Sequence, residues 1–178
     1  MGPLDMEIRA LFDPRKNPHF SDGEAQLWVA YNRQGRTIGR IAAFVYYPKA
    51  RRYAVPTGGM GFWETIEDYT VAEALLDTAQ EWLQTRGLEA ADACVNFGEN
   101  DRFWGVLVEG FDTPPAYGMP YNKPYYADFL ARYGFEVYFR QESRELDLRQ
   151  VPERIIRIAQ RAAQKEGVTF AHPEKRRL

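Results

Sequence analysis

The sequence predicts an α+β (α/β) fold built on a mixed, mostly antiparallel β-sheet with flanking helices. Segments 26–31 and 37–47 are rich in apolar and β-branched residues and flank a turn at 32–35, which is typical of a β-hairpin. A glycine-punctuated apolar strand at 60–64 leads through an acidic turn into an amphipathic helix. Another apolar segment, 90–97, follows after a crossover long enough for parallel pairing, so a central parallel pair is expected.

The strand at 60–64 is preceded and interrupted by glycines, at Gly58, Gly59 and Gly61. Glycine inside a strand is typical of a bulge or of a close approach by another piece of backbone, and we expect one of these here. The same glycines do not form a phosphate-binding loop, because no Lys-Ser/Thr pair follows them.

The helix after the acidic turn has the clearest pattern in the chain. Its apolar side chains recur every three or four residues, so they share the face that is expected to pack in the core. These side chains are Val71, Ala72, Leu75, Leu76, Ala79, Trp82 and Leu83. Thr70 and Glu73 have the spacing of a capping box at its start, and Gly87 is placed to end it in a left-handed conformation.

Residues 98–124 form a long connection rich in glycine, proline and aromatic residues, and long loops often carry function. The apolar stretch at 103–108 predicts a helical turn. Segment 125–133 predicts a short helix that Gly134 ends, and alternating polar and apolar residues over 135–148 predict one or two final strands.

The C-terminal region is basic: residues 149–178 carry 8 basic and 3 acidic side chains, a net charge of +5 against −7 for the remainder. A helix is expected there, with Arg154, Arg157, Arg161 and Lys165 on one face and Val151, Ile155, Ile158, Ala159 and Ala162 on the other. This pattern fits either a solvated helix face or a contact with an anionic surface. We expect a domain over 1–149, then a basic helix or linker over 150–178 whose end, from residue 167, is frayed.

The composition excludes several classes of protein. With 178 residues, 45% of them hydrophobic and 15% aromatic, the chain is long enough for one folded domain with a core. No apolar run reaches the ~18–20 residues of a membrane span, and the acidic main body argues against nucleic-acid binding. The start of the chain lacks the layout of a secretion signal, so a cytoplasmic location is expected.

Metal binding is not expected, because His19 and His172 are far apart in the sequence and Cys94 is the only cysteine. Cys94 lies in an apolar, strand-like stretch, so we expect a buried and unreactive thiol.

Candidate functional residues begin at the end of the strand 60–64. Glu64 fits a general base that acts on an amine, or else an exposed carboxylate near a helix N-terminus. The polar residues just past the segment 90–97 either bind substrate at the carboxyl end of that strand or fold the turn. They are Asn96, Glu99, Asn100, Asp101 and Arg102.

Aromatic and polar residues of the long connection complete the candidate substrate pocket, and they are Trp104, Tyr121, Asn122, Tyr125 and Tyr126. Tyr125 and Tyr126 offer hydroxyls for acid catalysis, although tyrosine more commonly packs in the core with its hydroxyl at the surface.

The order of these elements resembles that of the GNAT (Gcn5-related N-acetyltransferase) fold, with the motifs GGMGFWE, EWLQTRG and ARYGFEVYF. More narrowly, DPRKNPHF, GRTIGRIAAF, VNFGENDRFWGVLVEGF and YNKPYYADFLARYGF resemble the first half of bacterial two-half GNAT-like proteins. The resemblance covers residues 10–149, and 96–111 is its most specific part. It implies that the family's first strand and helix are missing from this chain, as is a second half.

This resemblance implies transfer of an acyl group from acetyl-CoA or another acyl-CoA to a small-molecule amine. The thioester would lie along the strand, and the pyrophosphate at the start of the following helix. The residues implied for the thioester are Phe62, Trp63 and Glu64.

The chain departs from the family pattern at two points. The turn before the helix is acidic and lacks the glycines that usually approach the phosphates, and Leu130 stands where many members have a general-acid tyrosine. Tyr125 or Tyr126 would then replace that acid.

Two functions therefore remain open. One is an acyltransferase, and the other is a degenerate half that no longer binds CoA and serves as a structural or ligand-recognition module for a partner half. A missing first strand would leave a sheet edge open to self-pairing, so a homodimer is a second expected partner.

Overall fold

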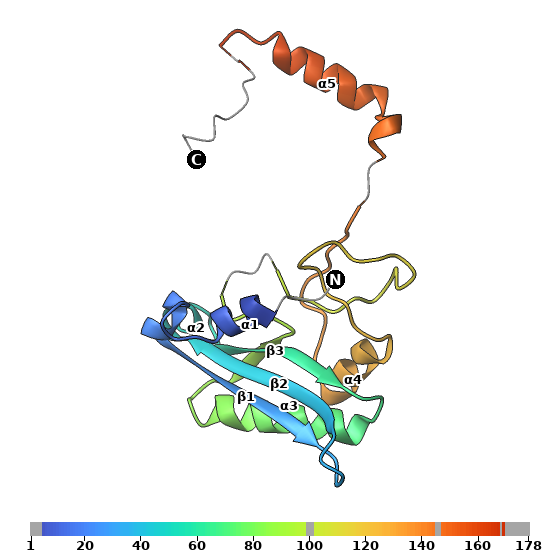
Figure 1. Ribbon diagram of the computed structural model, residues 1–178. Coiled ribbons are helices and arrows are strands. Elements are labelled where there is room, and N and C mark those ends of the chain that lie inside the picture. The colour runs from blue at the N-terminus through green and yellow to red at the C-terminus, as the bar shows by residue number, and fades with distance from the viewer. Residues whose placement is uncertain (1–4, 99–101, 145–146, 168, 170–178) are drawn as a thin grey trace. The chain divides into compact units, whose positions relative to one another are not determined.

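The structure, a computed structural model, describes residues 5–98, 102–144, 147–167 and 169. The chain divides into two units, Met1–Glu136 and Val137–Leu178, and each is described by itself. The first unit carries the β-sheet and the helices around it, and the second carries one long helix, α5 (Figure 1).

The described residues form one sheet of four strands in the order β1-β2-β3-β4. The strands are β1 (Gly23–Tyr31), β2 (Thr37–Tyr46), β3 (Thr57–Thr65) and β4 (Ala90–Ala93). β1 and β2 form the predicted hairpin, β3 is antiparallel to β2, and β4 is parallel to β3. The predicted mixed sheet is confirmed, but β4 ends at Ala93 rather than at residue 97 and the parallel pair lies at the edge of the sheet.

The first unit also holds α1 (Asp5–Leu11), the 3-10 turn η1 (Pro18–Ser21), α2 (Tyr47–Ala50), α3 (Tyr69–Gln84) and α4 (Tyr125–Tyr133). The two helices that the sequence predicts here are α3 and α4, and α4 ends at Gly134, whose φ of 112° is left-handed. α1 precedes the hairpin, and the sequence alone does not predict it. α2 was also unforeseen; Pro48 stands in its first turn, where a missing N–H breaks no helical hydrogen bond.

Two predicted elements of the later chain are not formed. The helical turn expected at 103–108 is absent because Phe103 has φ of 54° and Gly105 has φ of 86°, both outside the right-handed helical region. The strands expected over 135–148 are absent from the part of that range that the structure describes. An alternating pattern forms a strand only when its backbone finds a hydrogen-bonded neighbour, and none of the described residues in this range belongs to a strand.

The helix α3 packs against one face of the sheet, below it in Figure 1, while α1 and α2 lie on the other side. The residues that α3 buries are Ala72, Leu75, Leu76, Ala79 and Leu83. They meet β2 and β3 in the main core through Ile41, Ala43, Val45, Met60 and Trp63. The predicted apolar stripe is confirmed, with Val71 and Trp82 half-buried at its borders.

The chain after β4 crosses the opposite face of the sheet. The Val95 N–H donates to the Met60 carbonyl oxygen at 2.8 Å, and a Cβ on Gly61 would overlap the Val95 carbonyl oxygen. Beyond this crossing, the Phe97 ring stacks on Phe44 of β2 at a centroid distance of 5.3 Å. Phe97 and Phe44 belong to a smaller core cluster on this face, which also includes Leu11, Phe12 and Phe20. The close backbone approach predicted from the glycines is confirmed.

Asp68 caps α3, because its carboxylate accepts the Thr70 N–H at 2.9 Å while its own backbone is extended. The predicted capping box of Thr70 and Glu73 is wrong, since the helix begins at Tyr69, one residue before Thr70. At the other end Gly87 has the predicted left-handed conformation, with φ of 74°.

Replacing Asp68 by alanine is expected to lower the free energy of unfolding by about 1 kcal/mol, because the first turn of α3 loses its side-chain acceptor. Thr70→Ala removes no cap and should stay within about 0.5 kcal/mol of the unmodified protein. Urea denaturation of the two variants measures both values. A larger loss of unfolding free energy for Thr70→Ala than for Asp68→Ala would mean that Thr70, and not Asp68, caps the helix.

The second unit contains η2 (Leu148–Gln150) and α5 (Glu153–Ala163). The predicted basic, amphipathic helix is confirmed, and none of its residues is buried; Ile155 is 44% exposed and Ile158 56%. Whether this helix is solvated or meets an anionic surface stays a prediction, as does the division at residues 149 and 150. The expected frayed end lies outside the described residues except for Gly167 and Thr169.

Candidate functional site

The end of β3 meets the start of α4 at Thr65, where two tyrosines bind one residue's backbone. The Thr65 N–H donates to the Tyr126 hydroxyl oxygen at 3.0 Å, and the Tyr125 hydroxyl donates to the Thr65 carbonyl oxygen at 2.8 Å. The Trp63 ring packs against that of Tyr126 at a centroid distance of 4.8 Å. Trp63, Thr65, Tyr125 and Tyr126 are termed the Thr65 cluster below.

The helix α3 holds α4 in this position. The Tyr133 hydroxyl lies 2.7 Å from Asp77 Oδ1, and the Arg132 guanidinium lies over the Tyr69 ring at 3.7 Å from its centroid. Leu130, where the resemblance leads one to expect a tyrosine, is buried in the main core and is an apolar packing residue.

The two tyrosines of the cluster hold their protons at neutral pH. Burial raises the pKa of Tyr126, and the bond from the Thr65 N–H only partly offsets this. Burial also raises the pKa of Tyr125. Both hydroxyls can donate a proton or a hydrogen bond, whereas neither is suited to act as a base.

The predicted thioester residues of β3 point to different faces of the sheet. β3 has a bulge at Phe62 and Trp63, which together oppose one residue of β2, and Phe62 has φ of 50°. The Phe62 ring packs on Phe12 at 5.2 Å, on the α1 side, while Trp63 joins the Thr65 cluster on the α3 side.

Glu64 is at the surface, and its carboxylate pairs with Arg40 at 2.8 Å. Of the two interpretations of Glu64, the exposed carboxylate fits this position. Its role as a general base stays a prediction.

The start of α3 does not fit the pyrophosphate of a CoA molecule. Glu64, Glu67 and Asp68 place three carboxylates there, and Asp68 already accepts the Thr70 N–H that an anion would use.

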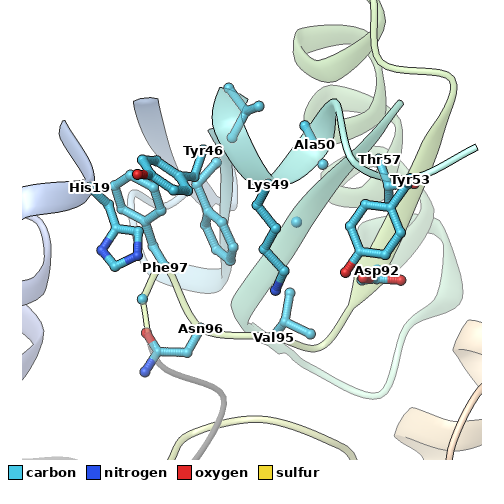
Figure 2. A pocket seen from close by; sticks show the side chains of 15 residues that line it. His19, Tyr46, Lys49, Ala50, Tyr53, Thr57, Asp92, Val95, Asn96 and Phe97 are labelled. Atoms are coloured by element: carbon cyan, nitrogen blue, oxygen red, sulfur yellow. The ribbon is translucent and has the colours of Figure 1, made fainter. Parts of the chain in front are cut away.

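A second polar site lies at the opposite end of β3, where β2 ends (Figure 2). It is a surface pocket of about 70 Å³. The polar side chains that line it come from several segments of the chain, and they are His19, Tyr46, Lys49, Tyr53, Thr57, Asp92 and Asn96. Gly58 and Gly59 of β3 form part of its wall.

Asp92 and Lys49 bring opposite charges to this pocket without pairing. Lys49 extends through the middle of the pocket in Figure 2, and Asp92 lies to one side of it, next to Tyr53. Burial raises the pKa of the half-buried Asp92, although Lys49 pulls it down to a smaller extent. Among the described residues, neither charge has an ion-pair partner within 4.0 Å, and neither side chain makes a hydrogen bond.

Asn17 fixes the orientation of His19 at the rim of the pocket. Asn17 Nδ2 donates to the carbonyl oxygens of Leu11 at 2.8 Å and Phe97 at 2.9 Å, so Oδ1 is the atom that faces His19. Oδ1 lies 3.1 Å from His19 Nδ1 and can only accept, so Nδ1 carries a proton. In neutral His19 the other nitrogen, Nε2, is then an acceptor.

Asn96 is the one predicted substrate residue that lines the pocket. Its Nδ2 donates to the Arg102 carbonyl oxygen at 3.2 Å, and its Oδ1 is buried without a partner in the described part of the chain. An unsatisfied buried acceptor is costly unless a water or a ligand donates to it.

The other predicted substrate residues lie elsewhere. Asn122 binds both backbone groups of Leu107, at 2.7 and 3.1 Å, and so holds the long connection together. Tyr121 is 70% exposed. The Arg102 guanidinium nitrogen Nη1 lies 3.9 Å from Glu7 Oε1 and forms an ion pair with it. Trp104 is half-buried in the same connection. Glu99, Asn100 and Asp101 lie outside the described residues.

The structure thus brings Trp63, Tyr125 and Tyr126 together at one end of β3 and places Asn96 in the pocket towards the other end. The pocket residues that sequence reasoning missed are His19, Lys49, Tyr53 and Asp92. Asp92 alone gave a signal, as a carboxylate in the otherwise apolar run AADAC.

Within the described residues, no group of three or more His, Cys, Asp or Glu side chains lies close enough together to hold a metal ion. None of the helices described combines the length and the apolar character that a membrane crossing requires. Cys94 is half-buried rather than fully buried, and desolvation of its thiol raises the pKa to about 12, which agrees with the predicted unreactive cysteine.

These features define the class of protein: an α+β domain with a mixed sheet, a tyrosine cluster at one end of β3 and a polar pocket at the other. The chain is 36% identical to Protein YghO of Escherichia coli (strain K12) over 120 residues, 67% of this chain and 30% of that protein. It is 33% identical to the Bacterial ceramide synthase of Caulobacter vibrioides (strain NA1000 / CB15N) over 135 residues, 75% of this chain and 34% of that protein.

The chain spans about a third of the length of both these curated relatives. No family model matches it. A solved structure from Pyrococcus furiosus, described as a presumed acetyl transferase, is similar with a TM-score of 0.42 and 15% identity over 81% of each chain.

Proposed function

We propose that the chain is part of an N-acyltransferase, which moves an acyl group to a small amine. The observation that carries this proposal is the open end of the parallel pair. β4 pairs with β3 only as far as Met60 and Ala93, whereas β3 continues to Thr65. Beyond Met60, the β3 edge on this side is met by the hydroxyls of Tyr125 and Tyr126 instead of a strand.

The chemistry of the residues gathered there supports the proposal. Transfer of an acyl group to an amine requires that the amine lose a proton and that the leaving group gain one. Tyr125 and Tyr126 keep their protons at neutral pH, so they are the proposed acids. Glu64, on the same strand end, is the proposed base, and release from Arg40 would free it to act.

The name of one relative also supports the proposal. A ceramide is an amide of a fatty acid and a long-chain amino alcohol, so a ceramide synthase forms an N-acyl bond. The Caulobacter protein carries that name, and 75% of this chain aligns with it at 33% identity. The acyl donor proposed is a thioester such as acetyl-CoA or another acyl-CoA, and its phosphates would be bound away from the acidic turn at 64–68.

A second function is favoured by the start of α3 and by Leu130. The carboxylates of Glu67 and Asp68 oppose a phosphate, and the usual acid is replaced by a buried leucine. These observations favour a non-catalytic half of a two-half protein. Such a half would no longer bind CoA and would recognise a ligand or support a partner half.

Thermal unfolding with acetyl-CoA and with longer acyl-CoAs separates the two functions. Binding of an acyl-CoA at a hundred times its Kd should stabilise the protein by about 2.7 kcal/mol and raise the melting temperature by roughly 5–10 °C. Adenosine 3′,5′-bisphosphate is the control, because it keeps the adenosine and two of the three phosphates of CoA but lacks the thioester. If millimolar acyl-CoA does not shift the melting temperature and no free thiol is released in the presence of amines, the acyltransferase is excluded. The second function, a recognition module, then stands.

A further inference from the structure

The pocket at the start of β3 has more hydrogen-bond acceptors than its own donors satisfy. The Asp92 carboxylate makes no hydrogen bond in the described part of the chain, and Asn96 Oδ1 is buried without a partner. His19 Nε2 adds an acceptor when the ring is neutral, because Asn17 Oδ1 keeps the proton on Nδ1. A ligand that suits this lining is rich in N–H or O–H donors.

Lys49 sets a second requirement. Its ammonium lies among these acceptors, and it does not close on Asp92 to form an ion pair within 4.0 Å. A ligand that carried only positive charge would be repelled by Lys49, and one that carried only negative charge would be repelled by Asp92. A ligand that presents a cationic group to Asp92 and an oxygen to Lys49 satisfies both.

The size of the pocket limits what it can hold. Its volume is about 70 Å³, while one water needs about 10–15 Å³ by the same kind of measure, so roughly five non-hydrogen atoms fit. A nucleotide or an acyl chain is excluded from the pocket, whereas a small head group enters it.

We propose that this pocket binds a primary ammonium group with an oxygen function three or four bonds away, the chemistry shared by amino alcohols and amino acids. Asp92 accepts from the ammonium, and Lys49 binds the oxygen. Because the pocket lies at the opposite end of β3 from Glu64, Tyr125 and Tyr126, this ligand is not the amine of the proposed acyl transfer, and its binding does not rest on that proposal.

Binding is tested with ethanolamine and serinol for the alcohol class and with glycine and β-alanine for the acid class. The control compounds are ethylamine, which lacks the oxygen, and acetate, which lacks the ammonium. Titrations followed by ¹⁵N–¹H spectra should move the amide signals of Gly58, Gly59 and Asp92, at a Kd at least tenfold lower for one test class than for both controls.

Two substitutions assign the binding to the charges. Asp92→Asn and Lys49→Met should each raise the Kd at least tenfold, because each removes one charge and keeps the shape of the side chain. Matched controls are Asp112→Asn and Lys16→Met, which change exposed residues outside the pocket and should leave the Kd within twofold. Asp92→Asn removes a carboxylate that is left without a partner, so its melting temperature should not fall below that of the unmodified protein.

The results that would overturn this inference differ from those that would overturn the acyltransferase. Equal binding of ethylamine, or no movement of the Gly58 and Gly59 signals with any amine at 50 mM, about the upper end of useful titration, removes the pocket ligand. An Asp92→Asn variant that binds the test amines with an unchanged Kd also overturns this inference. Binding of a test amine without any response to acyl-CoA keeps the inference and removes the acyltransferase.

Discussion

Replacing Gly61 by alanine is expected to lower the free energy of unfolding by about 3 kcal/mol, at the upper end of the usual cost of overpacking. The added Cβ would overlap the Val95 carbonyl oxygen, which is a backbone atom and cannot rotate away. Relief requires that residues 95–97 move off β3. That movement would also unstack Phe97 from Phe44 and weaken the smaller core cluster.

The control for Gly61→Ala is Gly110→Ala. A Cβ on Gly110 meets nothing within 4 Å, but its φ of 80° costs a non-glycine residue about 1–2 kcal/mol. Gly110→Ala therefore measures backbone strain without crowding. Thermal unfolding should show a drop of roughly 6–12 °C for Gly61→Ala and a smaller one for the control. Equal losses would mean that the chain after β4 does not cross β3 at Gly61.

The sequence predicts elements whose signal is local and strong. The stripe of α3 fixes the face that packs on β2 and β3, and Gly87 and Gly134 end their helices because glycine accepts a positive φ. The predicted cap of α3 is wrong because Asp68 and Thr70 are both residue types that cap helices well. A pattern of residue types cannot say which of two adjacent candidates has the extended backbone.

Features that depend on distant neighbours could not be predicted. The alternation over 135–148 fits a strand, but a strand also needs a neighbour, which the described residues do not supply. The pocket is built from His19, Lys49 and Asp92, which lie on a 3-10 turn, a four-residue helix and a short strand. Asp92 reaches the pocket because β4 pairs with β3 at Gly59, and His19 reaches it because its ring packs on Tyr46 and Phe97.

For Tyr125 and Tyr126, the sequence predicts the residues but not the contacts that they make. The sequence singles out both as candidate acids, yet it gives no sign that they meet Thr65, sixty residues earlier. Both tyrosines at the start of α4 bind the backbone of Thr65. The Tyr126 hydroxyl accepts from the N–H, and the Tyr125 hydroxyl donates to the carbonyl oxygen. The same contact places two proton-holding hydroxyls where the parallel pair opens.

Replacing Tyr126 by phenylalanine should lower the free energy of unfolding by about 2 kcal/mol, because the buried Thr65 N–H loses its acceptor while the ring stays packed on Trp63. Tyr125→Phe is the matched variant. The Tyr126 hydroxyl also lies 3.5 Å from the Thr65 carbonyl oxygen and can turn towards it, so this variant should cost about 1 kcal/mol or less. Urea denaturation of both variants checks the order of the two losses.

Kinetics then separate a structural hydroxyl from a catalytic one. If Tyr126 supplies the proton in acyl transfer, kcat of Tyr126→Phe should fall by at least about 10²-fold while KM for the amine stays nearly constant. A hydroxyl that only holds Thr65 would instead change kcat by a factor close to that of Tyr125→Phe. Should Tyr125→Phe lose most of the turnover and Tyr126→Phe keep it, the acid is Tyr125, because its hydroxyl is the less buried of the two and the more easily reached by a leaving group.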